Sequence, residues 1–189
     1  MNADPEAQSF LMNILVVIIL TVINAFFASA ELAYVSINRQ KIENMADEGD
    51  KKAKRVLKLL EEPDDFLATI QVAITLAGLF NSASASSNFV PYLEPLLGSI
   101  SGWQTIATII ITILLSYITL VLGELYPKQI ALQMPEELAR MTSGTISVVK
   151  VVVKPFVWLL SASTNILKKL SPIDFSKQEE KLTRDEMRQ

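Results

Sequence analysis

Glu124 is the residue with the strongest case for chemistry, because it is a carboxylate inside a hydrophobic stretch. Residues 105–120 carry no charge, and Glu124 follows in the same apolar run, between Gly123 and Pro127. A charged side chain inside a membrane helix costs about 2.5 to 3.5 kcal/mol on insertion scales, so it usually has a partner or a function. Pro127 also leaves the Gly123 carbonyl without its helical donor. A carboxylate beside a freed carbonyl can bind a hard cation.

Glu124 also has a structural interpretation. It lies four residues before Lys128, a spacing at which Glu and Lys form an ion pair on one helix face. The carboxylate would then mark the end of a membrane helix in the headgroup region. The residue alone leaves both interpretations open.

The composition restricts any site to oxygen ligands. The chain has 189 residues, is 50% hydrophobic, and contains no cysteine and no histidine. Disulfides, thiolate sites and imidazole ligands are therefore excluded, and Mg²⁺, Ca²⁺ or Na⁺ suits the chain better than Zn²⁺ or Cu²⁺. We expect no enzyme, since an intramembrane enzyme would need a Ser–Lys pair and no membrane-embedded lysine is near a candidate serine. The net charge of -3 argues against nucleic acid as a partner.

Three apolar stretches are long enough to cross a lipid bilayer, at about 10–36, 66–88 and 104–128. Residues 37–64 between the first two are polar and rich in lysine and arginine, and predict a helical hairpin broken at Gly49. The positive-inside rule places this hairpin in the cytoplasm and the N-terminus outside. We therefore predict an all-α membrane protein of the plasma membrane, with three transmembrane helices, a cytoplasmic polar helical hairpin and juxtamembrane helices.

The segment 136–170 is the ambiguous part of the topology. Its centre is apolar, but Lys150 and Lys154 lie inside it and Pro155 interrupts it. A crossing would carry further lysines outside, against the charge rule. We predict two helices that lie along or dip into the inner leaflet and leave the C-terminus in the cytoplasm. The two predicted helices are about 136–153 and 155–170.

Each predicted span carries polar side chains that lipid would not solvate. The first has Asn24, Ser29 and Glu31, and the second turns polar and small from Asn81 onward. The small residues fit either a tight helix interface or a stripe of hydroxyls that faces a cavity. Polar faces from three helices could converge into an oxygen-lined cation site that includes Glu124. Glu31 could instead pair with a lysine or arginine of the juxtamembrane helices.

Four segments of the chain carry a resemblance to a known family: Asn24–Glu31, Glu48–Asp50, Phe66–Gln71 and Gly123–Lys128. In order and spacing they resemble the membrane domain of the CorC/cyclin M (CNNM) magnesium transporters. The resemblance covers about residues 10–170 and implies sodium-coupled Mg²⁺ export, with Na⁺ as the coupling ion, by a homodimer. It also implies a membrane domain over 1–171 and a connector, 172–189, to a cytosolic pair of CBS modules that binds ATP.

The resemblance also implies a set of metal ligands. Glu124 matches the acidic residue of the family's site, and the others lie in its first-helix serine motif and second-helix polar stretch. For Asn81 to meet Ser29, the second helix must begin below the membrane or kink near Gly78. The implied metal ligands are Ser29, Asn81, Ser82, Ser86 and Glu124.

A hypothesis from another class is a membrane anchor and dimerisation module. Its small residues would pack helices, and its juxtamembrane part would transmit the state of a cytosolic sensor domain. Changes of Ser82 and Ser86 to alanine would then leave ion flux intact, whereas changes to leucine would disrupt assembly.

Overall fold

The computed structural model describes residues 5–170, apart from the side chains of residues 5–7, 86, 87 and 169. The predicted connector at 172–189 lies outside these residues. The described part is all helical and contains no strand. In chain order the elements are α1 (Pro5–Ser36), α2 (Arg39–Asp47), α3 (Lys51–Leu60), α4 (Pro63–Phe89), the 3₁₀ turn η1 (Val90–Leu93), α5 (Glu94–Leu97), α6 (Trp103–Leu120), the π-helix η2 (Val121–Leu125), α7 (Tyr126–Gln133) and α8 (Pro135–Leu170).

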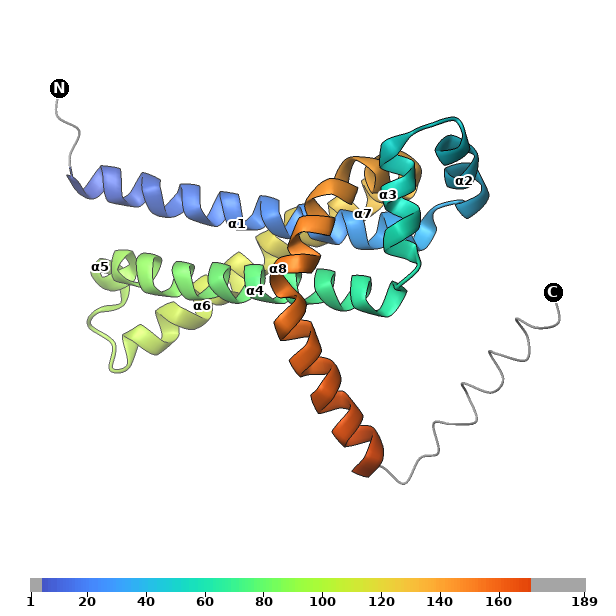
Figure 1. Cartoon of the computed structure of the whole chain (residues 1–189). Coiled ribbons are helices and arrows are strands. Elements are labelled where there is room, and N and C mark those ends of the chain that lie inside the picture. The colour runs from blue at the N-terminus through green and yellow to red at the C-terminus, as the bar shows by residue number, and fades with distance from the viewer. Residues whose placement is uncertain (1–4, 171–189) are drawn as a thin grey trace.

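The three predicted spans form one bundle. The first lies in α1, the second in α4, and the third in α6 and η2, reaching into α7. Figure 1 shows α1, α4 and α6 running side by side, with α2 and α3 at one end and α5 at the other. By length and composition, α1, α4, the α6–α7 segment and also α8 are long and apolar enough to cross a membrane.

The predicted break at Pro155 is wrong, because α8 is one helix with Pro155 inside it. Proline removes one backbone hydrogen bond, but a long helix can absorb this loss by bending. Figure 1 shows that α8 changes direction along its length and crosses α1 and α4 at a steep angle instead of joining their bundle.

The predicted polar hairpin is confirmed as the pair α2 and α3. Gly49 takes a left-handed backbone conformation (φ 98°) that suits glycine and turns the chain between them. Asn38 caps α2 by accepting from the Lys41 amide at 3.2 Å, and Asp50 caps α3 by accepting from the Lys52 amide at 2.7 Å. These caps begin each helix where the sequence changes from turn residues to helix formers.

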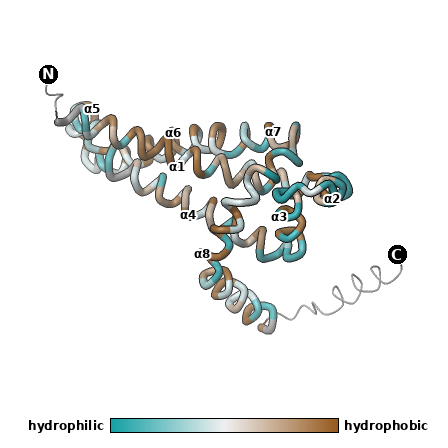
Figure 2. Tube along the Cα trace, turned by 45° about the horizontal axis from the view of Figure 1, so that its top comes forward, coloured by the Kyte–Doolittle hydropathy of each residue, from teal (hydrophilic) through white to brown (hydrophobic). Residues whose placement is uncertain are grey.

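The packed core lies at the hairpin end of the bundle. The Tyr34 ring lies 4.4 Å from the Phe66 ring, and the Tyr34 hydroxyl donates to the Ala139 carbonyl at 3.1 Å. Toward the other end large apolar side chains are exposed, such as Ile113 and Leu114 on α6. Figure 2 shows hydrophobic stretches along α1 and α6 and hydrophilic residues gathered at α2. The core also includes Ile42, Val56, Ile70 and Ile146.

Candidate cation site

A groove of about 310 Å³ runs between α4 and α6 and ends at Glu124. It brings two of the predicted ligands of the second helix together with the acid of the third. Its lining residues are Gly78, Asn81, Ser82, Leu115, Ser116, Thr119, Leu120 and Glu124.

Asn81 is the buried polar residue of this groove. Its amide nitrogen donates to the Thr21 hydroxyl at 3.2 Å and to the Thr119 hydroxyl at 3.1 Å. Its side-chain oxygen is buried and has no hydrogen-bond partner within the described residues. Buried polar atoms are normally paired, so this oxygen is an exception, and an amide oxygen is of the ligand type that hard cations prefer.

Glu124 lies in the π-helix η2, where the Tyr126 amide donates to the Val121 carbonyl. Its carboxylate accepts from the Lys128 ammonium at 3.0 Å, and its side chain is 39% exposed. The ion pair with Lys128 therefore forms, and Glu124 lines the groove as well. The extra residue of a π-turn is a feature that often accompanies functional sites.

Lys128 also lies 3.4 Å from the Glu31 carboxylate. The predicted ion pair of Glu31 thus exists, but its partner comes from α7 and not from the juxtamembrane segment. One ammonium holds two carboxylates, one from α1 and one from η2. This arrangement offsets one of the two negative charges near the end of the span and leaves the three side chains with a net charge of about -1.

The Gly123 carbonyl, which has no helical donor because of Pro127, accepts a hydrogen bond from α1. The Asn24 side-chain nitrogen donates to it at 2.9 Å, and the bond is buried. A Cβ atom at Gly123 would lie 3.3 Å from Asn24 and equally close to the methyl groups of Thr21 and Thr119. The glycine therefore permits close approach, and the freed carbonyl ties η2 to α1.

Ser29 lies away from the groove. Its hydroxyl donates to the Phe26 carbonyl at 2.9 Å, within its own helix. Asn81 instead meets Thr21, which precedes Ser29 by eight residues, or about 12 Å of helix. The structure does not bring Ser29 and Asn81 together, and α4 begins at Pro63.

The reason is the antiparallel register of α1 and α4. Tyr34 of α1 packs beside Phe66 of α4, so these two residues lie at the same height along the bundle. Asn81 is fifteen residues beyond Phe66, which is about 22 Å at 1.5 Å per residue. A similar distance along α1, counted from Tyr34 toward the N-terminus, reaches the part of the helix around Thr21.

The polar stretch of α4 has a packed face and a face with Ser82 at the groove. Ala77, Asn81 and Ala85 are buried at a spacing of four residues, as a close helix interface requires. Ser82 is exposed on the neighbouring face and lines the groove. Ser86 lies on α4 one turn further along, and its role as a ligand stays a prediction because its side chain lies outside the described residues.

The sequence prediction missed Ser116 and Thr119 of α6. They lie three residues apart and precede Gly123 by seven and four, so they share its helix face, a spacing visible in the sequence. Among the described residues no group of three or more acidic side chains could hold a metal. A cation in the groove would therefore meet one carboxylate and several neutral oxygens.

Comparison with known proteins places the chain in a family. Residues 14–189 match the family described as the cyclin M transmembrane N-terminal domain, CNNM. The chain belongs to the CNNM transmembrane domain family. CNNM domains are transporter domains and not enzymes, so the expectation of no enzyme is confirmed.

Relatives of this CNNM domain occur in several bacteria. It is 34% identical over 178 residues to UPF0053 protein sll0260 of Synechocystis sp., with 91% of this chain and 39% of the relative covered. It is 32% identical over 154 residues to the UPF0053 inner membrane protein YfjD of Escherichia coli, with 80% and 33% covered. It is 30% identical over 164 residues to the polyamine export protein of Haemophilus influenzae, with 83% and 37% covered.

The CNNM chain spans between a third and two fifths of the length of these relatives. They are therefore longer proteins, in which this membrane domain is one part. Its apolar helices and its family make the chain a multi-span membrane protein.

Proposed function

We propose that this CNNM domain exports Mg²⁺ in exchange for Na⁺, with the groove between α4 and α6 as the cation site. The observation that carries the proposal is the buried, unpartnered side-chain oxygen of Asn81 in the same groove as the Glu124 carboxylate. Magnesium is commonly bound through one or two carboxylates while it keeps several waters. Glu124 supplies the negative charge, and Asn81 and Ser82 supply neutral oxygens.

The size of the groove supports a partly hydrated ion. Each water takes about 30 Å³ of liquid volume, so a groove of about 310 Å³ has room for an ion with several waters. Ser116 and Thr119 add hydroxyl oxygens on the α6 side. Ser29 and Ser86 stay in the proposed ligand set through the family resemblance, and Ser29 requires a conformation in which α1 has shifted along α4.

Lys128 gives Glu124 an internal counter-ion. With its ammonium at 3.0 Å, the carboxylate need not stand uncompensated in the absence of a metal. An arriving cation competes with Lys128, which keeps Glu31 as its second partner. The ion pair therefore weakens cation binding and favours release of the ion, which transport also requires.

The proposed topology has the N-terminus outside, three spans and the C-terminus in the cytoplasm. The helix α8 then lies along the inner leaflet. The chain acts as a homodimer within a longer protein whose cytosolic CBS pair binds ATP. The greater length of the relatives supports further domains.

A second candidate cargo is a polyamine. The Haemophilus influenzae relative is named a polyamine export protein. In this chain Glu124 and Glu31 already bind a primary alkylammonium, that of Lys128, at 3.0 and 3.4 Å. Two carboxylates arranged around an ammonium also suit an organic polycation.

The test measures binding and flux of both cargoes with the full chain in detergent and in proteoliposomes. We expect Glu124→Gln to weaken Mg²⁺ binding about tenfold or more, because even partners outside the ligand set of a metal change affinity about 10- to 100-fold. Glu94→Gln, a change of an exposed acid on α5, is the matched control and should bind as wild type. Lys128→Met should strengthen Mg²⁺ binding, since it removes the competing ammonium.

Unchanged Mg²⁺ affinity in Glu124→Gln would contradict the site. Polyamine flux that depends on Glu124 without Mg²⁺ flux would establish the second candidate instead. If neither cargo moves and Ser82→Leu disrupts the dimer while Ser82→Ala does not, the chain is an anchor and dimerisation module.

A further inference from the structure

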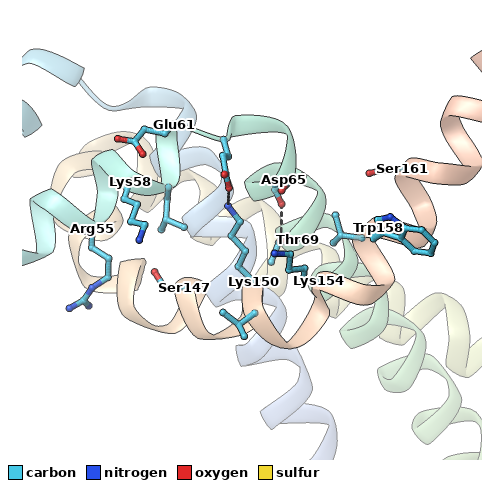
Figure 3. Close-up of a pocket in the computed structure, with 14 residues that line it drawn as sticks. Arg55, Lys58, Glu61, Asp65, Thr69, Ser147, Lys150, Lys154, Trp158 and Ser161 are labelled. Carbon is cyan, nitrogen blue, oxygen red and sulfur yellow. Dashed lines mark hydrogen bonds and ion pairs between the residues drawn. The ribbon is translucent and has the colours of Figure 1, made fainter.

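A second pocket, of about 670 Å³, lies at the hairpin end of the molecule and shares no residue with the cation groove. It is formed by the end of α3, the start of α4 and the middle of α8. Figure 3 shows basic side chains at this pocket on two of these elements: Arg55 and Lys58 on α3, and Lys150 and Lys154 on α8.

Three of these four cations form no ion pair among the residues that the structure describes. Lys150 pairs with Glu62, and the three without a pair in the described part of the chain are Arg55, Lys58 and Lys154. The hydrogen bond from Lys150, with the charges of Lys154 and Lys58, holds the pKa of the Glu62 carboxyl below its usual range. One carboxylate thus lies within the field of three lysines, and that field favours an anion.

The pocket has a net positive charge. Its lining has four basic side chains and three acidic ones. The acids lie on the turn after α3 and at the start of α4, opposite the lysines of α8. The acidic residues are Glu61, Glu62 and Asp65.

The α8 side of the pocket continues into an apolar surface. Val151, Val157 and Trp158 line that side, and the Trp158 side chain is 70% exposed. Beyond Trp158 the helix exposes Leu159 and Leu167. Tryptophan concentrates at membrane–water interfaces, so a pocket with lysines inside and an exposed tryptophan at its rim suits the boundary of a leaflet.

We propose that this pocket binds the headgroup of an anionic phospholipid of the inner leaflet. Lys58 and Lys154 contact its phosphate, and its acyl chains follow the exposed apolar half of α8. Basic pockets at the cytoplasmic ends of membrane helices favour such headgroups, and a soluble phosphate would make no use of the adjoining apolar surface. The inference rests on the proposed placement of α8 at the inner leaflet, but not on the cation site.

The experiment uses Trp158 as the reporter. The full chain with Trp103→Phe keeps a single tryptophan, since the sequence has two. It is reconstituted in phosphatidylcholine bilayers that contain either brominated phosphatidylglycerol or brominated phosphatidylcholine as the quencher. We expect stronger quenching by the anionic lipid, and a preference that falls about tenfold in Lys58→Ala/Lys154→Ala.

The matched control is Lys51→Ala/Lys52→Ala, which removes the same charge from the exposed start of α3 outside the pocket. It should keep the preference, and Mg²⁺ binding should be unchanged in both double variants. Equal quenching by the two lipids, or a preference that survives Lys58→Ala/Lys154→Ala, overturns the lipid site while the placement of α8 stands.

Two further outcomes separate the alternatives. Quenching by neither lipid overturns both the lipid site and the proposed placement of α8, while the cation site keeps its own test. A Trp158 fluorescence change on adding inorganic phosphate in detergent, without a lipid preference in bilayers, assigns the pocket to a soluble anion and overturns the lipid proposal.

Discussion

At the residue scale, the centre of the bundle is held by polar atoms that satisfy one another. Asn24 binds the carbonyl that Pro127 leaves free, and Asn81 joins Thr21 of α1 to Thr119 of α6. In lipid no water replaces a lost partner, so these bonds position the groove as well as stabilise it. The Asn81 oxygen is the atom left available after these bonds are made.

We expect Asn24→Leu to destabilise the domain by about 1 kcal/mol, because the buried Gly123 carbonyl loses its donor. Thermal unfolding in detergent measures the change. Asn13→Leu is the control, an asparagine of the same helix that makes no hydrogen bond within the described residues. Equal losses in the two variants would contradict the role assigned to the Asn24 bond.

At the element scale, short capped helices at the hairpin end hold the long helices in place. Asp50 caps α3 and also forms an ion pair with Arg140 of α8 at 2.6 Å. Lys41 of α2 pairs with Glu136 at the start of α8, at 3.2 Å. The hairpin therefore ties α8 across the end of the bundle, which positions the basic pocket between them.

We expect acidic pH to weaken the contact between the hairpin and α8, because Asp50 becomes protonated. The hydrogen bond from the Lys52 amide, with those from the Ala53 amide and Arg140, holds the pKa of Asp50 below its usual range. A carboxyl with a lowered folded-state pKa stabilises the protein above its unfolded pKa of about 3.9, and this contribution is lost as the pH falls through the folded value. We expect Asp50→Asn to reduce the fall in melting temperature between about pH 5 and pH 3.

The matched control for Asp50→Asn is Asp47→Asn. Asp47 ends α2 on the same hairpin and forms no ion pair or side-chain hydrogen bond in the part of the chain that the structure covers. It should keep the acid sensitivity of the wild type. Identical pH profiles for the wild type and Asp50→Asn would show that this carboxylate does not link stability to pH.

At the scale of the whole molecule, the position of α8 decides whether the chain crosses the membrane three or four times. Length and composition alone allow α8 to cross. Its first half, however, buries Thr142, Ser143 and Ile146 against the rest of the protein, and its axis departs from that of the bundle (Figure 1). A helix anchored in this way at the hairpin end fits the surface of the leaflet better than its interior.

Cysteine labelling tests this topology directly, because the chain has no cysteine of its own. We expect Asn165→Cys near the end of α8 to react with an impermeant maleimide from the same side as Lys52→Cys in the hairpin. Ser99→Cys, between α5 and α6, should react from the opposite side. Labelling of Asn165→Cys from the side of Ser99→Cys would establish a fourth crossing.

Features that depend on a local pattern of residues could be predicted from the sequence. Runs of apolar residues locate the helices of the bundle, the polar composition and Gly49 locate the hairpin, and the spacing of Glu124 and Lys128 predicts their ion pair. Each of these follows from residues close together in the chain, since helix periodicity, turn chemistry and i,i+4 contacts are local.

The tertiary structure alone decided which polar groups meet. The register of α1 against α4 puts Asn81 beside Thr21 and not Ser29, and the Gly123 carbonyl goes to Asn24. The sequence also did not reveal that α8 continues through Pro155 or that a basic pocket forms between α8 and α3. The physical reason is that such contacts join residues far apart in sequence, so their partners are set by how whole helices pack.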